Sequence, residues 1–123
     1  MPENKRKSIL IADTEPRVRQ ALRLLCEQAL EMDVVGEARF ITELFVLVEA
    51  LQPDIVLLDW YLPGQRSITA ELLSDLRALC PVTIIITGIH AEARADALAS
   101  GAAAFVHKGD TPDKLVEILN ALH

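Results

Sequence analysis

The sequence predicts an α/β protein in which helices cover both faces of a parallel β-sheet. Short apolar segments rich in β-branched residues alternate with longer segments whose apolar residues recur every three or four positions. The apolar segments are continuous runs, which is typical of strands buried on both faces, as in a parallel sheet. A length of 123 residues suits one domain. We therefore expect residues 1–123 to form a single domain, with residues 1–7 as a flexible N-terminus.

Five strands and five helices are expected in strict alternation. The predicted strands are Ser8–Ala12, Val34–Ala38, Asp54–Leu58, Val82–Thr87 and Ala103–His107. The predicted helices are Glu15–Leu30, Thr42–Leu51, Ser67–Leu79, Ala91–Ser100 and Pro112–Leu122. Alternation of this kind implies right-handed crossovers between parallel strands.

Proline, glycine and alanine mark the ends and the packing of these helices. Pro16 and Pro112 stand where a first-turn proline is favoured, and Thr111 is expected to cap the last helix. Gly101 is expected just past a helix end, where a left-handed conformation is common. The alanine-rich stretch 91–104 predicts a helix with few large side chains, which we expect to be mobile.

Composition disfavours several classes of protein. Hydrophobic residues make up 51% of the chain and charged residues 24%, which indicates a globular fold. The net charge of −6 argues against non-specific nucleic-acid binding, and the one basic run, Lys5–Lys7, is expected to be a solvated terminus. Cys26 and Cys80 form no Cys-x-x-Cys motif, so we expect buried free thiols. Because the chain has no secretory h-region and no apolar run of ~20 residues, a cytoplasmic location is expected.

Four residues of chemical interest stand at the carboxyl ends of four predicted strands. Asp13 and Asp59 follow the first and third strands, Thr87 ends the fourth, and Lys108 follows the fifth. Ligands of open parallel sheets bind outside the carboxyl ends of the strands, so we expect these side chains to meet. A single Asp at the end of a strand is more often a turn or helix cap than part of a site. Two Asp, a Thr and a Lys at the ends of four different strands indicate a functional site.

This set of residues suits phosphoryl transfer assisted by a divalent cation. Two nearby carboxylates repel each other, and Mg²⁺, which prefers oxygen ligands, relieves that repulsion. A carboxylate can also act as a nucleophile toward phosphorus and form an acyl phosphate. A lysine and a hydroxyl group are the expected stabilisers of the negative charge on the transferred group.

Four segments, taken in order along the chain, resemble one family. Residues 9–16 (ILIADTEP) resemble a first strand with its acidic turn, and residues 54–64 (DIVLLDWYLPG) resemble a phosphoacceptor strand with its loop. Residues 86–88 (ITG) resemble a switch position, and residues 101–108 (GAAAFVHK) a fifth strand with its aromatic residue and lysine. The family is the receiver domain of response regulators in two-component signal transduction, and NarL/LuxR-type receivers are the most similar. The resemblance implies the flavodoxin-like fold, a doubly wound (βα)5 protein with a five-stranded parallel sheet in the order 2-1-3-4-5.

The resemblance also implies a phosphoacceptor and a metal site. Asp59 would take a phosphoryl group from the phosphohistidine of a sensor histidine kinase, while Asp13, Asp59 and the backbone carbonyl of Tyr61 would hold Mg²⁺. Thr14 departs from the family, because it occupies the place of a second metal-binding acid and brings no charge to the site. Glu15 lies next to the site but is expected to begin the first helix, so we do not expect it to replace the missing ligand.

Five further residues complete the predicted site. Thr87 and Lys108 would contact the phosphoryl oxygens, and the rotamer of Phe105 would report the state of Thr87. Trp60 and Gly88 would lie beside the acceptor and the switch residue.

The sequence leaves two leading functions open. The first is a switch that catalyses its own phosphorylation and dephosphorylation, rather than a conventional enzyme, and controls output through the face of the fourth helix, fifth strand and fifth helix. The second is an atypical pseudo-receiver, an interaction module independent of phosphorylation, and Thr14 keeps this hypothesis open. A phosphohydrolase is disfavoured because Trp60 and Tyr61, and no second carboxylate, follow Asp59. A flavin or nucleotide binder is disfavoured because no glycine-rich loop follows the first strand.

Partners are implied only by the resemblance. A sensor histidine kinase is expected, and a homodimer is left open. The stretch Gly101–Asp110 resembles receivers joined to helix-turn-helix DNA-binding domains. Two arrangements stay open: a receiver followed after His123 by an output domain that regulates transcription, and a stand-alone receiver. This domain itself is expected to bind neither nucleic acid nor a membrane.

Overall fold

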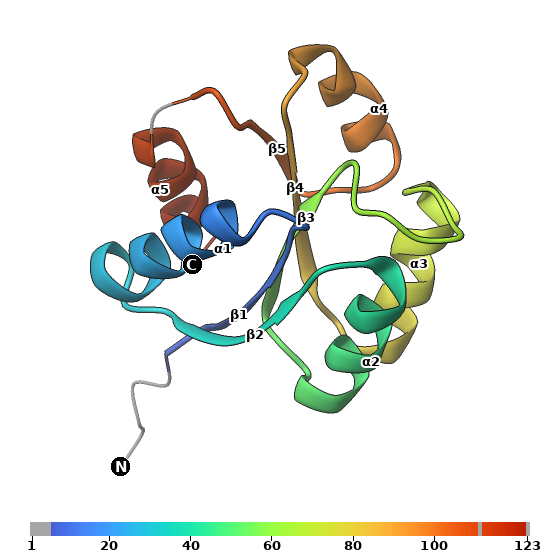
Figure 1. Cartoon of the computed structure of the whole chain (residues 1–123), viewed down its shortest axis with the longest axis horizontal. Coiled ribbons are helices and arrows are strands. Elements are labelled where there is room, and N and C mark those ends of the chain that lie inside the picture. The colour runs from blue at the N-terminus through green and yellow to red at the C-terminus, as the bar shows by residue number, and fades with distance from the viewer. Residues whose placement is uncertain (1–5, 111, 123) are drawn as a thin grey trace.

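The computed structural model describes residues 6–110 and 112–122. At its centre is one sheet of five parallel strands in the order β2-β1-β3-β4-β5 (Figure 1). The strands are β1 (Ser8–Ala12), β2 (Asp33–Ala38), β3 (Ile55–Asp59), β4 (Thr83–Gly88) and β5 (Ala104–His107). The predicted flavodoxin-like order is thereby confirmed, and each strand boundary lies within one residue of its prediction.

Helices cover both faces of this sheet. They are α1 (Pro16–Leu24) with a following π-helical turn (Leu25–Ala29), α2 (Ile41–Leu51), α3 (Ala70–Leu79), α4 (Arg94–Ala99) with a preceding 3-10 turn (Ala91–Ala93), and α5 (Pro112–Ala121). In Figure 1, α1 and α5 lie on one side of the sheet, and α2, α3 and α4 lie on the other. None of the helices within residues 6–110 and 112–122 combines the length and apolar composition that a membrane crossing requires.

The central strand β3 explains why the apolar runs are continuous. Ile55 and Leu57 belong to the core beneath α1 and α5, whereas Val56 and Leu58 belong to the core beneath α2 and α3. Successive side chains of a strand point to opposite faces, so a sheet covered on both faces needs an apolar residue at every position. Full burial of each such side chain stabilises the fold by about 1.5–3 kcal/mol.

The first helix ends differently from its prediction. The expected helix Glu15–Leu30 is α-helical only to Leu24, and the next turn is π-helical. The carbonyl of Cys26 accepts a hydrogen bond from the amide of Met32 at 2.9 Å, and both side chains are buried. The change from α-helix to π-helix therefore occurs where Cys26 and Met32 are buried in the core. The periodicity of apolar residues cannot show such a change, because it does not depend on the type of helix. Cys26, like Cys80, is a buried free thiol, as predicted.

The third helix begins later than predicted, at Ala70 instead of Ser67. Thr69 has an extended backbone, and its hydroxyl accepts a hydrogen bond from the amide of Leu72 at 3.2 Å. A side-chain cap of this kind satisfies an amide that has no partner inside the helix and so fixes where the helix starts. The predicted start was wrong because the cap was not recognised.

The prolines and the glycine that the sequence places at helix ends lie where they were predicted, but one predicted helix is shorter. The predicted helix Ala91–Ser100 is instead a 3-10 turn followed by the short α4. Gly101 has a φ of +105°, which confirms a glycine past a helix end. Pro16 and Pro112 begin α1 and α5, as predicted. The predicted cap Thr111 lies outside the described residues.

The strand order fixes where a site can form. β1 pairs with β2 on one side and with β3 on the other, so the chain runs outward from β1 in both directions. At such a switch point the loops after the two central strands diverge and leave a crevice at their carboxyl ends. In this fold those ends carry Asp13 and Asp59.

Candidate functional site

Two buried carboxylates and one ammonium group meet at the carboxyl ends of β1, β3 and β5. The Nζ atom of Lys108 lies 2.6 Å from Oδ2 of Asp13 and 3.3 Å from Oδ2 of Asp59. The carboxylate side chains are only 2% and 7% exposed. Charges this far from water require a partner of opposite sign. The fold thus brings together three of the four residues that the sequence places at this edge.

The backbone orients both carboxylates in the same way. Oδ1 of Asp13 accepts a hydrogen bond from the amide of Glu15 at 2.9 Å, and Oδ1 of Asp59 accepts one from the amide of Tyr61 at 3.1 Å. A bond from an aspartate to the amide two residues further on is a local turn that Asp favours. In each aspartate one oxygen is therefore held by the chain, and the other faces Lys108.

Thr87, the fourth residue predicted for this edge, lies on β4 opposite Asp59 and is buried. The amide of Trp60 donates to the carbonyl of Thr87 at 2.8 Å, and the amide of Lys108 donates to the carbonyl of Gly88 at 2.8 Å. These bonds extend the pairing of β3, β4 and β5 past the strand ends. The main chain just after Asp59 and the main chain of Lys108 are therefore both bonded to β4.

Burial raises the pKa of Asp59 above its ordinary value. The amide of Tyr61 and the charge of Lys108 oppose this effect and lower the pKa, whereas the nearby charge of Asp13 raises it further. The net upward direction means that one ammonium group does not fully compensate two buried carboxylates. A further cation at this edge would favour the ionised form of Asp59.

The donor set suits Mg²⁺ in kind and is short by one acid. Asp13 and Asp59 offer the hard oxygen ligands that this ion prefers, and the ammonium between them is a cation already held by both. Thr14 is exposed and uncharged, and Glu15 is exposed and precedes the first turn of α1. Within the described ranges, no group of three or more His, Cys, Asp or Glu residues is arranged to hold a metal ion.

The residues around Thr87 and Gly88 have clear packing roles. Phe105 is buried, and a Cβ atom added to Gly88 would lie 3.0 Å from carbons Cε1 and Cζ of its ring. A larger residue at this position would displace the ring. Tyr61 and Ile89 are 51% and 57% exposed, and the Tyr61 ring makes an edge-on contact with the ring of His90, with centroids 5.9 Å apart.

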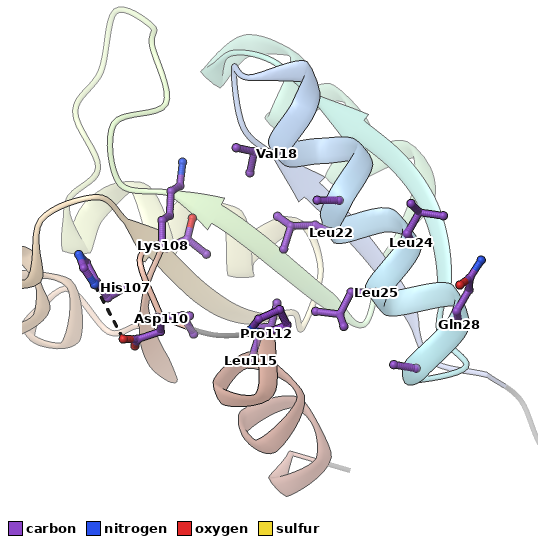
Figure 2. A pocket seen from close by; sticks show the side chains of 14 residues that line it. Val18, Leu22, Leu24, Leu25, Gln28, His107, Lys108, Asp110, Pro112 and Leu115 are labelled. Carbon is purple, nitrogen blue, oxygen red and sulfur yellow. Dashed lines mark ion pairs between the residues drawn. The ribbon is translucent and has the colours of Figure 1, made fainter.

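An open groove of about 520 Å³ lies between α1 and α5 (Figure 2). Its walls are mainly apolar and include Val18 and Leu22 of α1 and Leu115 of α5. Thr87 and Lys108 also line it, so these two residues border both the groove and the acidic edge, as we call the carboxyl ends of β1 and β3 with Asp13 and Asp59. The sequence does not predict this groove because it depends on the spacing between two helices.

Two residues that the sequence did not single out contact Asp13 or the loop that follows β4. Nη1 of Arg19 donates to the carbonyl oxygen of Asp13 at 2.7 Å. Nε2 of His107 lies 2.9 Å from the carbonyl oxygen of Ile89, in the loop after β4. Neither residue has a distinctive sequence signal. An arginine inside a predicted helix ordinarily lies on the solvated face of that helix, and a single histidine at the end of a strand belongs to no motif.

Known proteins of one family match this chain along almost its whole length. The family model described as the response regulator receiver domain matches residues 9–120. The nitrate/nitrite response regulator protein NarL of Escherichia coli is 31% identical over 117 residues, which make up 94% of this chain and 53% of that protein. The DNA-binding transcriptional activator DevR/DosR of Mycobacterium tuberculosis is 35% identical over 103 residues, covering 81% of this chain and 46% of that protein. The chain spans about half the length of the curated relatives it matches.

Solved structures give the same similarity. A two-component response regulator of the LuxR family from Aurantimonas sp. SI85-9A1 has a TM-score of 0.82 and 31% identity, over 96% of this chain and 85% of that one. The signal receiver domain of the response regulator NarL from Mycobacterium tuberculosis has a TM-score of 0.83 and 25% identity, over 96% of each chain.

Proposed function

The chain belongs to the response regulator receiver family, of the NarL/LuxR type, and on this premise we propose that Asp59 accepts a phosphoryl group from a sensor histidine kinase. The observation that carries the proposal is the setting of Asp59. It is buried at the switch point of the sheet, with Oδ1 held by the Tyr61 amide and Oδ2 facing Lys108. Of the two aspartates of this edge, it is the one that lies opposite the hydroxyl-bearing Thr87 in the strand pairing.

The transfer would form one bond and break one bond at phosphorus. An oxygen of the ionised Asp59 attacks phosphorus, the bond between phosphorus and the histidine nitrogen of the kinase breaks, and the electron pair stays on that nitrogen. Mg²⁺, if held by Asp13, Asp59 and the carbonyl of Tyr61, would neutralise charge on the phosphoryl oxygens. Lys108 contacts the Asp59 carboxylate at 3.3 Å, so its ammonium group would lie close to a phosphoryl group bound there and would stabilise its charge.

The switch would begin at Thr87 and spread along β4 and β5. A phosphoryl group on Asp59 offers a hydrogen-bond acceptor to the hydroxyl of Thr87. A shift of that residue would move the loop at Gly88, against which the Phe105 ring packs. Phosphorylation would thus select among pre-existing states of the face formed by α4, β5 and α5. The short, alanine-rich α4 has few large side chains to hold it in one position.

The wider setting follows the relatives. We propose that the domain works in the cytoplasm as part of a longer transcriptional regulator, since relatives that it matches are named as DNA-binding or transcriptional regulatory proteins. A homodimer is compatible with this role.

Phosphorylation by a small donor tests the assignment. Acetyl phosphate and Mg²⁺ should add one phosphoryl group to the protein, and Asp59→Asn should abolish the addition. Asp75→Asn is a matched control, because Asp75 is a half-exposed carboxylate on α3 paired with Arg66. Equal incorporation by the Asp59 variant and the wild type would contradict the proposal.

A pseudo-receiver is the second candidate, and the exposed Thr14 beside the acidic edge favours it. In this case the bond between Lys108 and the two aspartates would be structural, and the domain would act by binding alone. If wild-type protein takes no phosphoryl group and binds no Mg²⁺ at millimolar concentration, whereas Thr14→Asp does both, this second function is correct.

A further inference from the structure

Arg19 of α1 joins the turn Asp13–Glu15, which we call the acidic turn, to the strand β2. Its side chain is 13% exposed. Its Nη1 atom donates to the carbonyl oxygen of Asp13 at 2.7 Å, while its Nε atom donates to Oε1 of Glu37 on β2 at 2.8 Å. One planar guanidinium therefore makes two bonds in fixed relative directions, a geometry that a lysine cannot reproduce.

Glu37 is the anchor of this arrangement. Its other oxygen, Oε2, accepts a hydrogen bond from Nε of Arg23 at 2.8 Å. Burial raises the pKa of Glu37, but the bonds and charges of Arg23 and Arg19 outweigh burial, so the pKa lies below its ordinary value. Glu37 lies on β2 opposite Ile11 of β1, two residues before Asp13. Glu37 is thus ionised at neutral pH, and its main chain is held in the sheet by the pairing of β2 with β1.

With Arg19 in place, four separate contacts hold Asp13. Its amide donates to the Ala38 carbonyl at 2.9 Å, its carbonyl accepts from Arg19, its Oδ1 accepts from the Glu15 amide, and its Oδ2 contacts Lys108. The carbonyl bond fixes the peptide plane between Asp13 and the next residue. Without it, that peptide plane loses one restraint, and the bond between the Glu15 amide and Oδ1 is expected to open more often.

We infer that Arg19 is a positioning residue, which fixes the direction of the Asp13 carboxylate through the main chain of the acidic turn. The inference deepens the proposed function and rests on it only where cation binding is concerned. Because Thr14 stands where the family has a second acid, Asp13 is the carboxylate of this turn that faces the site, and Mg²⁺ affinity depends more strongly on its placement. Partners that orient a metal ligand without touching the metal commonly change affinity by about 10–100-fold.

Arg23 provides the control, because it makes the same kind of bond to the same Glu37 from the next turn of α1. It also pairs with Glu27 at 3.2 Å, and the structure gives it no bond to the acidic turn within the described residues. If these arginines only fasten α1 to β2, Arg19→Ala and Arg23→Ala should behave alike. If Arg19 positions Asp13, only its loss should change the acidic turn.

Amide hydrogen exchange in the metal-free protein tests the inference without any reference to phosphorylation. Arg19→Ala should speed exchange of the Glu15 amide severalfold and shift the ¹⁵N resonance of Thr14, whose nitrogen belongs to the released peptide group. Arg23→Ala should leave both signals near their wild-type values, although both variants lower the melting temperature. Equal Glu15 exchange in the two variants would overturn the inference.

A Mg²⁺ titration followed by Trp60 fluorescence separates positioning from simple charge. Arg19→Ala removes a positive charge and Glu37→Ala removes a negative one, so a purely electrostatic effect would change the affinity in opposite directions. Positioning predicts that both variants bind Mg²⁺ roughly tenfold more weakly. Opposite signs would overturn the inference. If the wild type neither binds Mg²⁺ nor accepts a phosphoryl group, the proposed function fails, and the Glu15 exchange still decides the role of Arg19.

Discussion

Thr14→Asp should tighten Mg²⁺ binding and speed phosphorylation of Asp59. The exposed Thr14 follows the buried Asp13 directly, so the new carboxylate would lie at the mouth of the acidic edge. Two carboxylates and the ammonium of Lys108 leave one net negative charge at the centre of the site. The substitution would double that negative charge. The attraction grows with the charge of the ion, so a divalent cation would be bound more tightly than a monovalent one.

The size of the effect follows from Coulomb's law. At about 4 Å and an effective dielectric constant of about 20, two unit charges attract by roughly 4 kcal/mol, and a divalent ion doubles this value. Desolvation of the ion and of the carboxylate offsets most of the gain. A net gain of about 1–3 kcal/mol remains, which is roughly a tenfold to hundredfold increase in affinity.

Fluorescence of Trp60 is the direct assay, because it is the only tryptophan of the chain and directly follows Asp59, the proposed acceptor. Thr14→Asn is the matched control, since asparagine has the shape of aspartate without its charge. The Asn variant should resemble the wild type, whereas the Asp variant should reach half-saturation at a tenth of the Mg²⁺ concentration or less. Equal affinities of the wild type and both variants would refute the reasoning and would mean that another group, such as Glu15, already supplies the missing ligand.

Three further predictions concern lifetime, output and acid stability. Tyr61 and Ile89 are exposed at the mouth of the site and should screen the acyl phosphate from water. Replacing both by serine should therefore speed dephosphorylation, measured as the loss of label from Asp59. An unchanged rate would count against screening. Phosphorylation should change amide exchange across Ala91–Leu122, and identical exchange in both forms would exclude a switch on this face. The pKa of Glu37 is lower in the folded than in the unfolded chain, so its stabilising contribution is present above the unfolded pKa and is lost as the pH falls through the folded pKa. Urea unfolding at neutral and acid pH should therefore show that Glu37→Gln loses less stability on acidification than the wild type, and equal losses would contradict the assignment.

The elements that the sequence predicted correctly are those set by local chemistry. The run Ile84–Ile86 is apolar at every position because β4 is covered on both faces, and the φ of +105° at Gly101 needs a residue without a Cβ atom. The predicted start of α3 failed, although its signal was local too, because Thr69 was not recognised as the cap. The end of α1 could not be read at all, since the π-helical turn accompanies burial of Cys26 against other elements.

For the site, the sequence by itself determined which residues reach the functional edge. Parallel strands bring their carboxyl ends to one edge of a sheet, so Asp13, Asp59, Thr87 and Lys108 were expected at that edge once the strands were assigned, whereas the order of the strands came only from the resemblance to the receiver family. Their residue types then limited the chemistry to charge and oxygen donors. These conclusions need only the period of the pattern and the positions of the strand ends.

The tertiary structure alone decided how those residues are held. The ammonium of Lys108 bridges two aspartates that lie 95 and 49 positions away in the chain, and Arg19 reaches both Glu37 and the main chain of the acidic turn. Such contacts depend on distances between elements to within about an ångström, because hydrogen bonds weaken steeply beyond their normal length. A pattern of residue types carries no distance between elements. The place of α1 beside Glu37 of β2 had to be known before Arg19 could be recognised, and the pairing of β5 with β4 before Lys108 could be placed between the two aspartates.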